Sequence, residues 1–173
     1  ASSSQFKSAI KIIRISGNNA KKISNIFNFK KPKPRTFALR KLIYKDNIID
    51  SAPVVWLPRK KSFTGEDTFE IYIHGSVVIE KLIFKILSSY KNFRLAGPGE
   101  FTKRATLNGN IDLIQAESIN EIINTQTEKQ LSIAQAQLDG SLSNLVNSWR
   151  KEIIYISSLI ESLIDFSDED IPE

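Results

Sequence analysis

Residues 61–75 read Lys-Ser-Phe-Thr-Gly-Glu-Asp-Thr-Phe-Glu-Ile-Tyr-Ile-His-Gly, a polar loop that leads into a β-strand. Successive side chains of a strand point to opposite faces. One face therefore carries apolar side chains and belongs to a core, and the other carries Glu70, Tyr72 and His74. A carboxylate beside an aromatic ring and an imidazole suits the binding of a flat heterocycle with N–H donors. Alternatively, Glu70 is a structural partner for a buried cation, most obviously Arg14.

Arg14 lies near the end of an apolar strand predicted for residues 9–15, directly before Ser16 and Gly17. A guanidinium is always charged, and leaving it unpaired in an apolar setting costs several kcal/mol. We therefore expect Arg14 either to clamp a ligand or to form an internal salt bridge. The sequence leaves both alternatives open.

The sequence pattern changes near residue 112. Before it, short β-branched runs alternate with turns, which predicts an α+β domain with a mixed sheet over residues 1–112. We expect strands at 9–15, 37–44, 48–49, 54–57 and 68–73, and helices at 18–29, 76–90 and from about 100. Beyond residue 112 the pattern is helical, which predicts a truncated all-α bundle over residues 113–173 with an acidic linker at 165–173.

The longest predicted helix runs from about Leu142 to about Phe166. Its apolar residues follow alternating steps of four and three, the spacing of helices that pack lengthwise against one another. The stripe comprises Leu142, Val146, Trp149, Ile153, Ile156, Ile160 and Leu163. We expect this stripe to need a packing partner.

The composition narrows the classes of function. With 41% hydrophobic residues the chain can bury a core, and it has no apolar run long enough to span a bilayer, so we expect a cytoplasmic protein with no membrane partner. Cysteine is absent, which excludes disulfides and thiolate metal sites in these residues. His74 is the only histidine, so we expect no metal site and no catalytic triad. No phosphate-binding GxxxxGK[ST] motif is present, so these residues should not hydrolyse GTP.

Charge is distributed unevenly. Residues 1–61 hold 15 lysines and arginines against only Asp46 and Asp50. Such a region can attract an anionic partner such as RNA phosphate. The alternative is a set of solvated lysines, because no aromatic interleaving accompanies the charge.

A third segment, residues 96–117, begins with two glycines around a proline, which predicts a tight turn into a helix near Glu100. It contains Pro-Gly-Glu-Phe-Thr-Lys-Arg-Ala at 98–105 and Ile-Asp-Leu-Ile-Gln-Ala-Glu at 111–117. Two earlier motifs are Ile-Ile-Arg-Ile-Ser-Gly at 12–17 and Ser-Phe-Thr-Gly-Glu-Asp at 62–67. In their order and spacing these motifs resemble the N-terminal half of the MnmE (TrmE) family of tRNA-modification GTPases. The resemblance covers nearly the whole chain and continues into Ile-Asp-Phe-Ser-Asp-Glu-Asp at 164–170.

The resemblance implies a specific function. It implies an N-terminal domain similar to tetrahydrofolate-binding domains, which forms a homodimer and binds 5-formyltetrahydrofolate. It also implies that the protein acts together with the flavoprotein MnmG to add a (carboxymethyl)aminomethyl group to the wobble uridine of certain tRNAs. GTP, Mg²⁺ and K⁺ are implied only for a GTPase domain that these residues lack. The family's folate-contacting arginine and glutamate fall on Arg14 and Glu70.

The sequence departs from the family pattern at Asn110, which stands where the family has a folate-contacting lysine. An amide can hydrogen-bond but cannot neutralise a ligand carboxylate, so we expect weaker folate binding or a neighbouring lysine in its place. His74-Gly75-Ser76 also replaces the usual His-Gly-Gly. Two other functions remain open: a ligand-free dimerisation scaffold, and a basic tRNA-binding module that uses Lys30, Lys31, Lys33 and Arg35.

Overall fold

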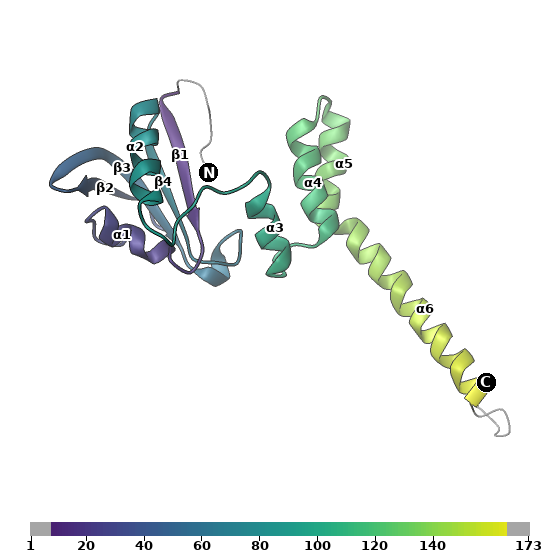
Figure 1. The fold of residues 1–173 in the computed structure, drawn as a ribbon. Helices are drawn as coiled ribbons and strands as arrows, with labels where there is room; N and C mark the ends of the chain where they lie inside the picture. Colours follow the sequence, from purple (N-terminus) through teal and green to yellow (C-terminus); the bar gives the residue numbers. More distant parts are fainter. Residues whose placement is uncertain (1–7, 166–173) are drawn as a thin grey trace. The chain divides into compact units, whose positions relative to one another are not determined.

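The computed structural model describes residues 8–165, which form two compact units that meet between residues 110 and 111. The first unit is an α+β domain (Figure 1). Its elements are β1 (Ile10–Ser16), η1 (Ala20–Lys22), α1 (Ile23–Ile26), β2 (Ala38–Tyr44), β3 (Asn47–Leu57), η2 (Arg59–Lys61), β4 (Thr68–His74), α2 (Val77–Ser88) and α3 (Glu100–Leu107). The α+β fold class expected from the sequence is confirmed.

The four strands form one sheet in the order β1-β4-β3-β2. All three ladders are antiparallel, and a single parallel bridge joins Pro34 to Trp56. The outer strand β1 pairs along its whole length with β4, so that Arg14 lies opposite Glu70. Alternation along β1 and β4 gives the sheet one apolar face and one face with polar side chains.

The core lies between the apolar face of the sheet and the helices α1 and α2 (Figure 1). Ile13, Phe69, Ile71 and Ile83 of this core are completely buried. Helix α2 begins as predicted, because the Ser76 hydroxyl accepts a hydrogen bond from the Val78 backbone N–H and caps the helix. The Lys11 side chain is also buried on this face, where it pairs with Glu80 of α2.

Two predicted elements of this unit differ from the structure. The helix predicted for residues 18–29 is shorter and comprises only η1 and α1, because Asn28 adopts a left-handed conformation (φ 47°) and ends it. The two short strands predicted at 48–49 and 54–57 form one strand, β3. Pro53 pairs with Leu39 of β2 and lies one residue before the ladder with β4 starts, so its missing N–H interrupts no bond to β4.

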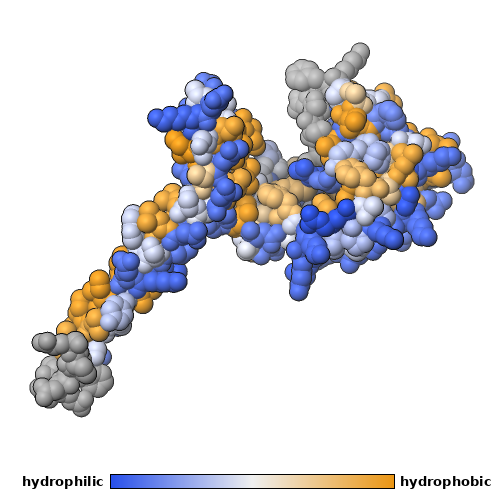
Figure 2. All heavy atoms as spheres, turned by 180° about the vertical axis from the view of Figure 1, so that it is seen from behind, coloured by the Kyte–Doolittle hydropathy of each residue, from blue (hydrophilic) through white to orange (hydrophobic). Residues whose placement is uncertain are grey.

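The second unit is helical and comprises α4 (Leu113–Asn124), α5 (Glu128–Leu138) and α6 (Ser141–Asp165). Helices α4 and α5 form a hairpin whose starts are fixed by capping boxes at Asp112 and Thr127. In α6 the predicted apolar stripe is solvent-exposed along its length (Figure 2). The linker predicted at 165–173 falls, beyond Asp165, outside the described residues. Within residues 8–165, no helix is long and apolar enough to cross a membrane.

Candidate functional site

Arg14 and Glu70 face each other across the β1–β4 ladder. The Arg14 Nε donates a hydrogen bond to Glu70 Oε1 at 2.7 Å. The Arg14 side chain is 51% exposed and the Glu70 side chain 15% exposed. Both side chains therefore lie on the same face of the sheet, and the guanidinium is not sealed beneath the core. The pair has the geometry of the salt bridge that the sequence allowed, in a position that a ligand can reach.

Tyr72 completes a short polar row on this face. Its hydroxyl donates a hydrogen bond to Glu70 Oε2 at 2.7 Å. Burial, together with the hydrogen bond to the Glu70 carboxylate, raises the pKa of Tyr72 to about 12. The phenol therefore stays protonated at neutral pH and remains a donor. Each oxygen of Glu70 thus accepts from one side chain, and a carboxylate oxygen can accept a further bond.

The surroundings of this row are apolar and open. The Phe37 ring lies 5.1 Å from the Tyr72 ring, centroid to centroid. Ile10, Phe37 and Leu39 are all exposed large apolar side chains. Alternation along β1 places Ile10 on the same face as Arg14. Leu39 pairs with Pro53, which shares a face of β3 with Val55, the partner of Glu70, so Leu39 also lies on this face. The charged pair therefore lies within an exposed apolar surface, which we call the open face: Ile10, Arg14, Phe37, Leu39, Glu70 and Tyr72.

His74 does not join this row. Its ring Nδ1 lies 2.7 Å from Asp50 Oδ1, and its backbone N–H donates to Asp50 Oδ2 at 2.9 Å. Both contacts tie the end of β4 to β3, which gives His74 a structural role. Within residues 8–165, no group of three or more histidine, aspartate or glutamate side chains is placed to hold a metal ion.

Asn110 lies at a different place in the domain. Its side-chain amide donates to the backbone carbonyls of Ser62 and Phe63, at 3.1 and 3.0 Å. Asn108 beside it donates to the carbonyl of Thr64 at 2.7 Å. The structure thus joins Arg14 to Glu70 by direct contact, whereas the hydrogen bonds of Asn110 go to the loop before β4.

The three sequence motifs meet in a polar network that the sequence analysis missed. Arg104 of α3 donates two hydrogen bonds of 3.0 Å to Glu66, and the Ser16 hydroxyl donates to the same carboxylate at 3.0 Å. Arg104 also bonds Glu100, which in turn accepts two bonds from Arg94. Hydrogen bonds from Arg94, from the Gly97 backbone and from Arg104 hold the pKa of Glu100 well below its usual range. Glu66 and Arg104 are 38 residues apart, and charged residues in polar segments gave no sequence signal for this contact.

A cavity of about 290 Å³ lies beside this network, between the end of β1, η1, the end of α2 and α3. Its apolar lining includes Ile15, Phe84, Leu87, Phe93 and Phe101. Its polar lining includes Ser16, Glu66, Arg94, Glu100 and Arg104, together with Arg14. Arg14 thus belongs both to the pair on the open face and to the wall of the cavity.

The chain is similar to proteins of known families over both units. Residues 1–110 match the family model of the GTP-binding protein TrmE N-terminus, and residues 113–173 match that of the MnmE helical domain. The tRNA modification GTPase MnmE of Anaplasma marginale (strain St. Maries) is 42% identical over 96% of this chain and 38% of its own length. That of Rickettsia akari (strain Hartford) is 42% identical over 100% of this chain and 40% of its own.

A Wolbachia relative with the same name is 44% identical over 94% of this chain and 37% of its own length. The chain therefore spans about two fifths of the length of the curated relatives that it matches. The order of the two matches follows the two units of the structure, α+β first and helical second. The chain belongs to the MnmE (TrmE) family of tRNA-modification GTPases and carries that family's N-terminal and helical domain sequences.

Proposed function

We propose that this chain binds 5-formyltetrahydrofolate on the open face of its N-terminal domain, with Arg14 and Glu70 as the contacting charges. The supporting observation is the direct pairing of these two side chains in an exposed position, with Tyr72 fixed to the same carboxylate. A pterin ring is flat and carries adjacent N–H donors, which a carboxylate accepts as charge-assisted hydrogen bonds. The guanidinium supplies matching donors for the oxygen atoms of the ligand.

The apolar part of the open face supports homodimerisation in the same proposal. Ile10, Phe37 and Leu39 are exposed large apolar side chains around the charged pair. A contiguous exposed apolar patch on a protein in water is typical of an interaction surface. In a symmetric dimer the same patch meets itself, so that burying this face would enclose a ligand held by Arg14 and Glu70.

The wider role of the chain follows from its family. The matched relatives are tRNA modification GTPases, so we propose that the chain supports the addition of a (carboxymethyl)aminomethyl group to wobble uridine in tRNA, together with MnmG. In this proposal the folate is the one-carbon donor, and the chain binds and positions it. The proposal assigns no GTP hydrolysis to residues 1–173, because they contain no phosphate-binding loop motif.

Isothermal titration calorimetry of the chain with 5-formyltetrahydrofolate tests this function. Glu70→Gln removes the charge but keeps the shape, and we expect it to weaken binding about tenfold or more, because hydrogen bonds to charged groups are worth about 1.5–3 kcal/mol. Glu128→Gln, at an exposed position in α5 of the helical unit, is the matched control and should bind as the wild type does. Absence of binding heat in the wild type would reject the folate proposal, and equal affinity in both variants would reject the role of Glu70.

A further inference from the structure

Two runs of basic residues that are far apart in sequence lie together at one end of the sheet. The first is Lys30, Lys31, Lys33 and Arg35, and the second is Arg59, Lys60 and Lys61. The parallel bridge between Pro34 and Trp56 joins the segments that carry them. The Arg35 backbone N–H donates to the Trp56 carbonyl at 2.8 Å, and its Nη1 donates to the Lys61 carbonyl at 3.5 Å. We call these seven residues the basic edge.

The positive charge of the basic edge is not neutralised within the described chain. All seven side chains are exposed, and within residues 8–165 none of them lies in an ion pair with a carboxylate. Several other cations of the domain do have such partners: Lys11 pairs with Glu80, Lys21 with Asp67 and Arg104 with Glu66. The basic edge therefore brings seven positive charges together without a carboxylate partner among the described residues.

The backbone that carries the charges is held in place. The ammonium of Lys31 lies 3.5 Å from the centroid of the Trp56 ring, a cation–π contact. The Lys30 carbonyl accepts from Arg40 Nε at 2.8 Å. In the second run, the backbone N–H of Arg59 donates to Asp67 Oδ1 at 3.2 Å and that of Lys61 to the Pro58 carbonyl at 2.8 Å. A charged surface that is already ordered loses little entropy when it binds a partner.

We propose that the basic edge binds the phosphate backbone of tRNA. This inference rests on the proposed function, because the relatives are tRNA-modifying, and it assigns the RNA contact to a specific surface of the N-terminal domain. The seven charges are spread over two segments of the surface, which suits an extended polyanion better than a small anion. Lysines supply point charges for phosphate groups, and five of the seven residues are lysine. Phe63, close to the second run, is exposed and offers a ring for stacking on an unpaired base.

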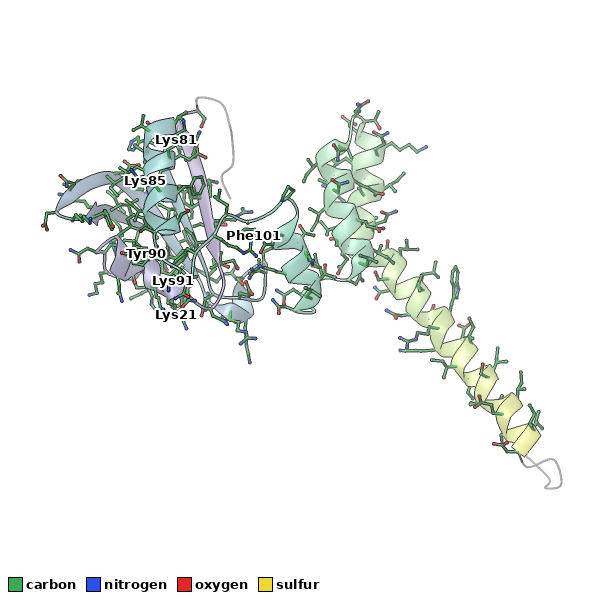
Figure 3. All side chains as sticks on the ribbon, viewed as in Figure 1. Lys21, Lys81, Lys85, Tyr90, Lys91 and Phe101 are labelled. Carbon is green, nitrogen blue, oxygen red and sulfur yellow. The ribbon has the colours of Figure 1, made fainter. Side chains whose placement is uncertain are left out.

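The test compares two double variants with the same change in net charge. Lys33→Gln/Lys60→Gln alters one residue from each run of the basic edge. Lys81→Gln/Lys85→Gln alters two exposed lysines on α2 (Figure 3). Glu80, next to Lys81 in α2, contacts Lys11, and Lys11 pairs with Ile73 near the C-terminal end of β4. Trp56, next to the basic edge, pairs with Phe69 near the N-terminal end of β4. The control pair thus lies toward the opposite end of the sheet.

Binding of a fluorescently labelled tRNA transcript to the 173-residue chain is measured by anisotropy over a series of salt concentrations. We expect the edge variant to bind about tenfold more weakly and its plot of log affinity against log salt to be shallower by about two units, one for each lost phosphate contact. The α2 variant should keep both the affinity and the slope of the wild type. Equal losses in the two variants would overturn the proposal, because net charge alone would then explain them, and so would an unchanged edge variant.

Two further measurements separate this proposal from its alternatives. Binding to vesicles of phosphatidylserine and phosphatidylcholine tests a membrane partner. If the edge variant loses vesicle binding but keeps its tRNA binding, the RNA assignment is overturned. Calorimetry of the edge variant with 5-formyltetrahydrofolate should give the wild-type affinity. If the wild-type chain binds no folate, while the edge variant alone loses tRNA binding, the proposed function is rejected and the tRNA proposal for the basic edge is supported.

Discussion

Glu66 and Arg104 are 38 residues apart and are joined by two hydrogen bonds of 3.0 Å, which link the loop before β4 to α3. Arg104 also bonds Glu100 within α3. The first and third sequence motifs converge on the same point, because Ser16 donates to the Glu66 carboxylate. The three motifs therefore form one structural joint of the domain, and the proposed ligand pair lies on β1 and β4.

Replacing Arg104 tests this joint. We expect Arg104→Gln to lower the free energy of unfolding of the N-terminal domain by about 1 kcal/mol, because it removes charge-assisted bonds from a partly exposed site. Urea denaturation followed by tryptophan fluorescence reports the change, since Trp56 lies in this domain. Lys103→Gln, at the adjacent exposed position, is the control. Equal midpoints for the two variants would show that the joint does not stabilise the fold.

The ion pair of Lys11 and Glu80 gives a second stability prediction. The Lys11 side chain is completely buried, and its ammonium lies 2.5 Å from Glu80 Oε2. Glu80→Ala leaves a buried charge without this partner, and we expect a loss of about 3 kcal/mol, whereas Lys11→Met, which removes the buried charge, should cost far less. Thermal or urea unfolding measures both. A Lys11→Met loss as large as that of Glu80→Ala would contradict the explanation.

Tyr72 gives a prediction for high pH. Its pKa in the folded chain is about 12, above the ordinary value of 10.0, so its protonated form is favoured by folding. This contribution to stability is present in full below pH 10 and is lost as the pH rises through 12. Ultraviolet titration of tyrosinate should therefore show one group that ionises late and is absent in Tyr72→Phe. In Glu70→Gln the same group should ionise at lower pH, because the hydrogen bond to the carboxylate is gone; an unchanged curve would show that Glu70 has no influence on it.

Asn110 tests the departure from the family pattern. A lysine at this position would add a charge that can neutralise a ligand carboxylate, and its ammonium could still donate to the carbonyls of Ser62 and Phe63. We expect Asn110→Lys to bind 5-formyltetrahydrofolate more tightly than the wild type, by a few-fold to about tenfold. Asn108→Lys is the neighbouring control. Calorimetry with unchanged affinity for Asn110→Lys would place this residue outside the ligand site.

The local patterns of the sequence predicted most of the elements. Alternation placed Glu70 and Tyr72 on one face of β4, and the helix predicted from residue 76 corresponds to α2, which begins at Val77. The helix predicted for residues 18–29 was too long, since its end depends on Asn28 in a left-handed conformation, for which the sequence carried no strong signal. Periodicity identified the stripe of α6 because its spacing is regular over many residues.

Contacts between distant residues were less accessible to sequence reasoning. The salt bridge of Arg14 with Glu70 was one of the two alternatives that the sequence left open, because a charge in an apolar strand requires a partner. The contact of Arg104 with Glu66 was not, because both residues are in polar segments where charge is unremarkable. The convergence of Lys30–Arg35 with Arg59–Lys61 also depends on tertiary structure, through the bridge of Pro34 with Trp56.

The most direct test of the central proposal is a crystal structure of the chain with 5-formyltetrahydrofolate bound. The proposal predicts that the pterin ring lies on the open face, with its N–H groups within hydrogen-bond distance of the Glu70 carboxylate and with Arg14 in contact with the ligand. A ligand bound elsewhere in the domain, with the Arg14–Glu70 pair intact and untouched, would contradict it.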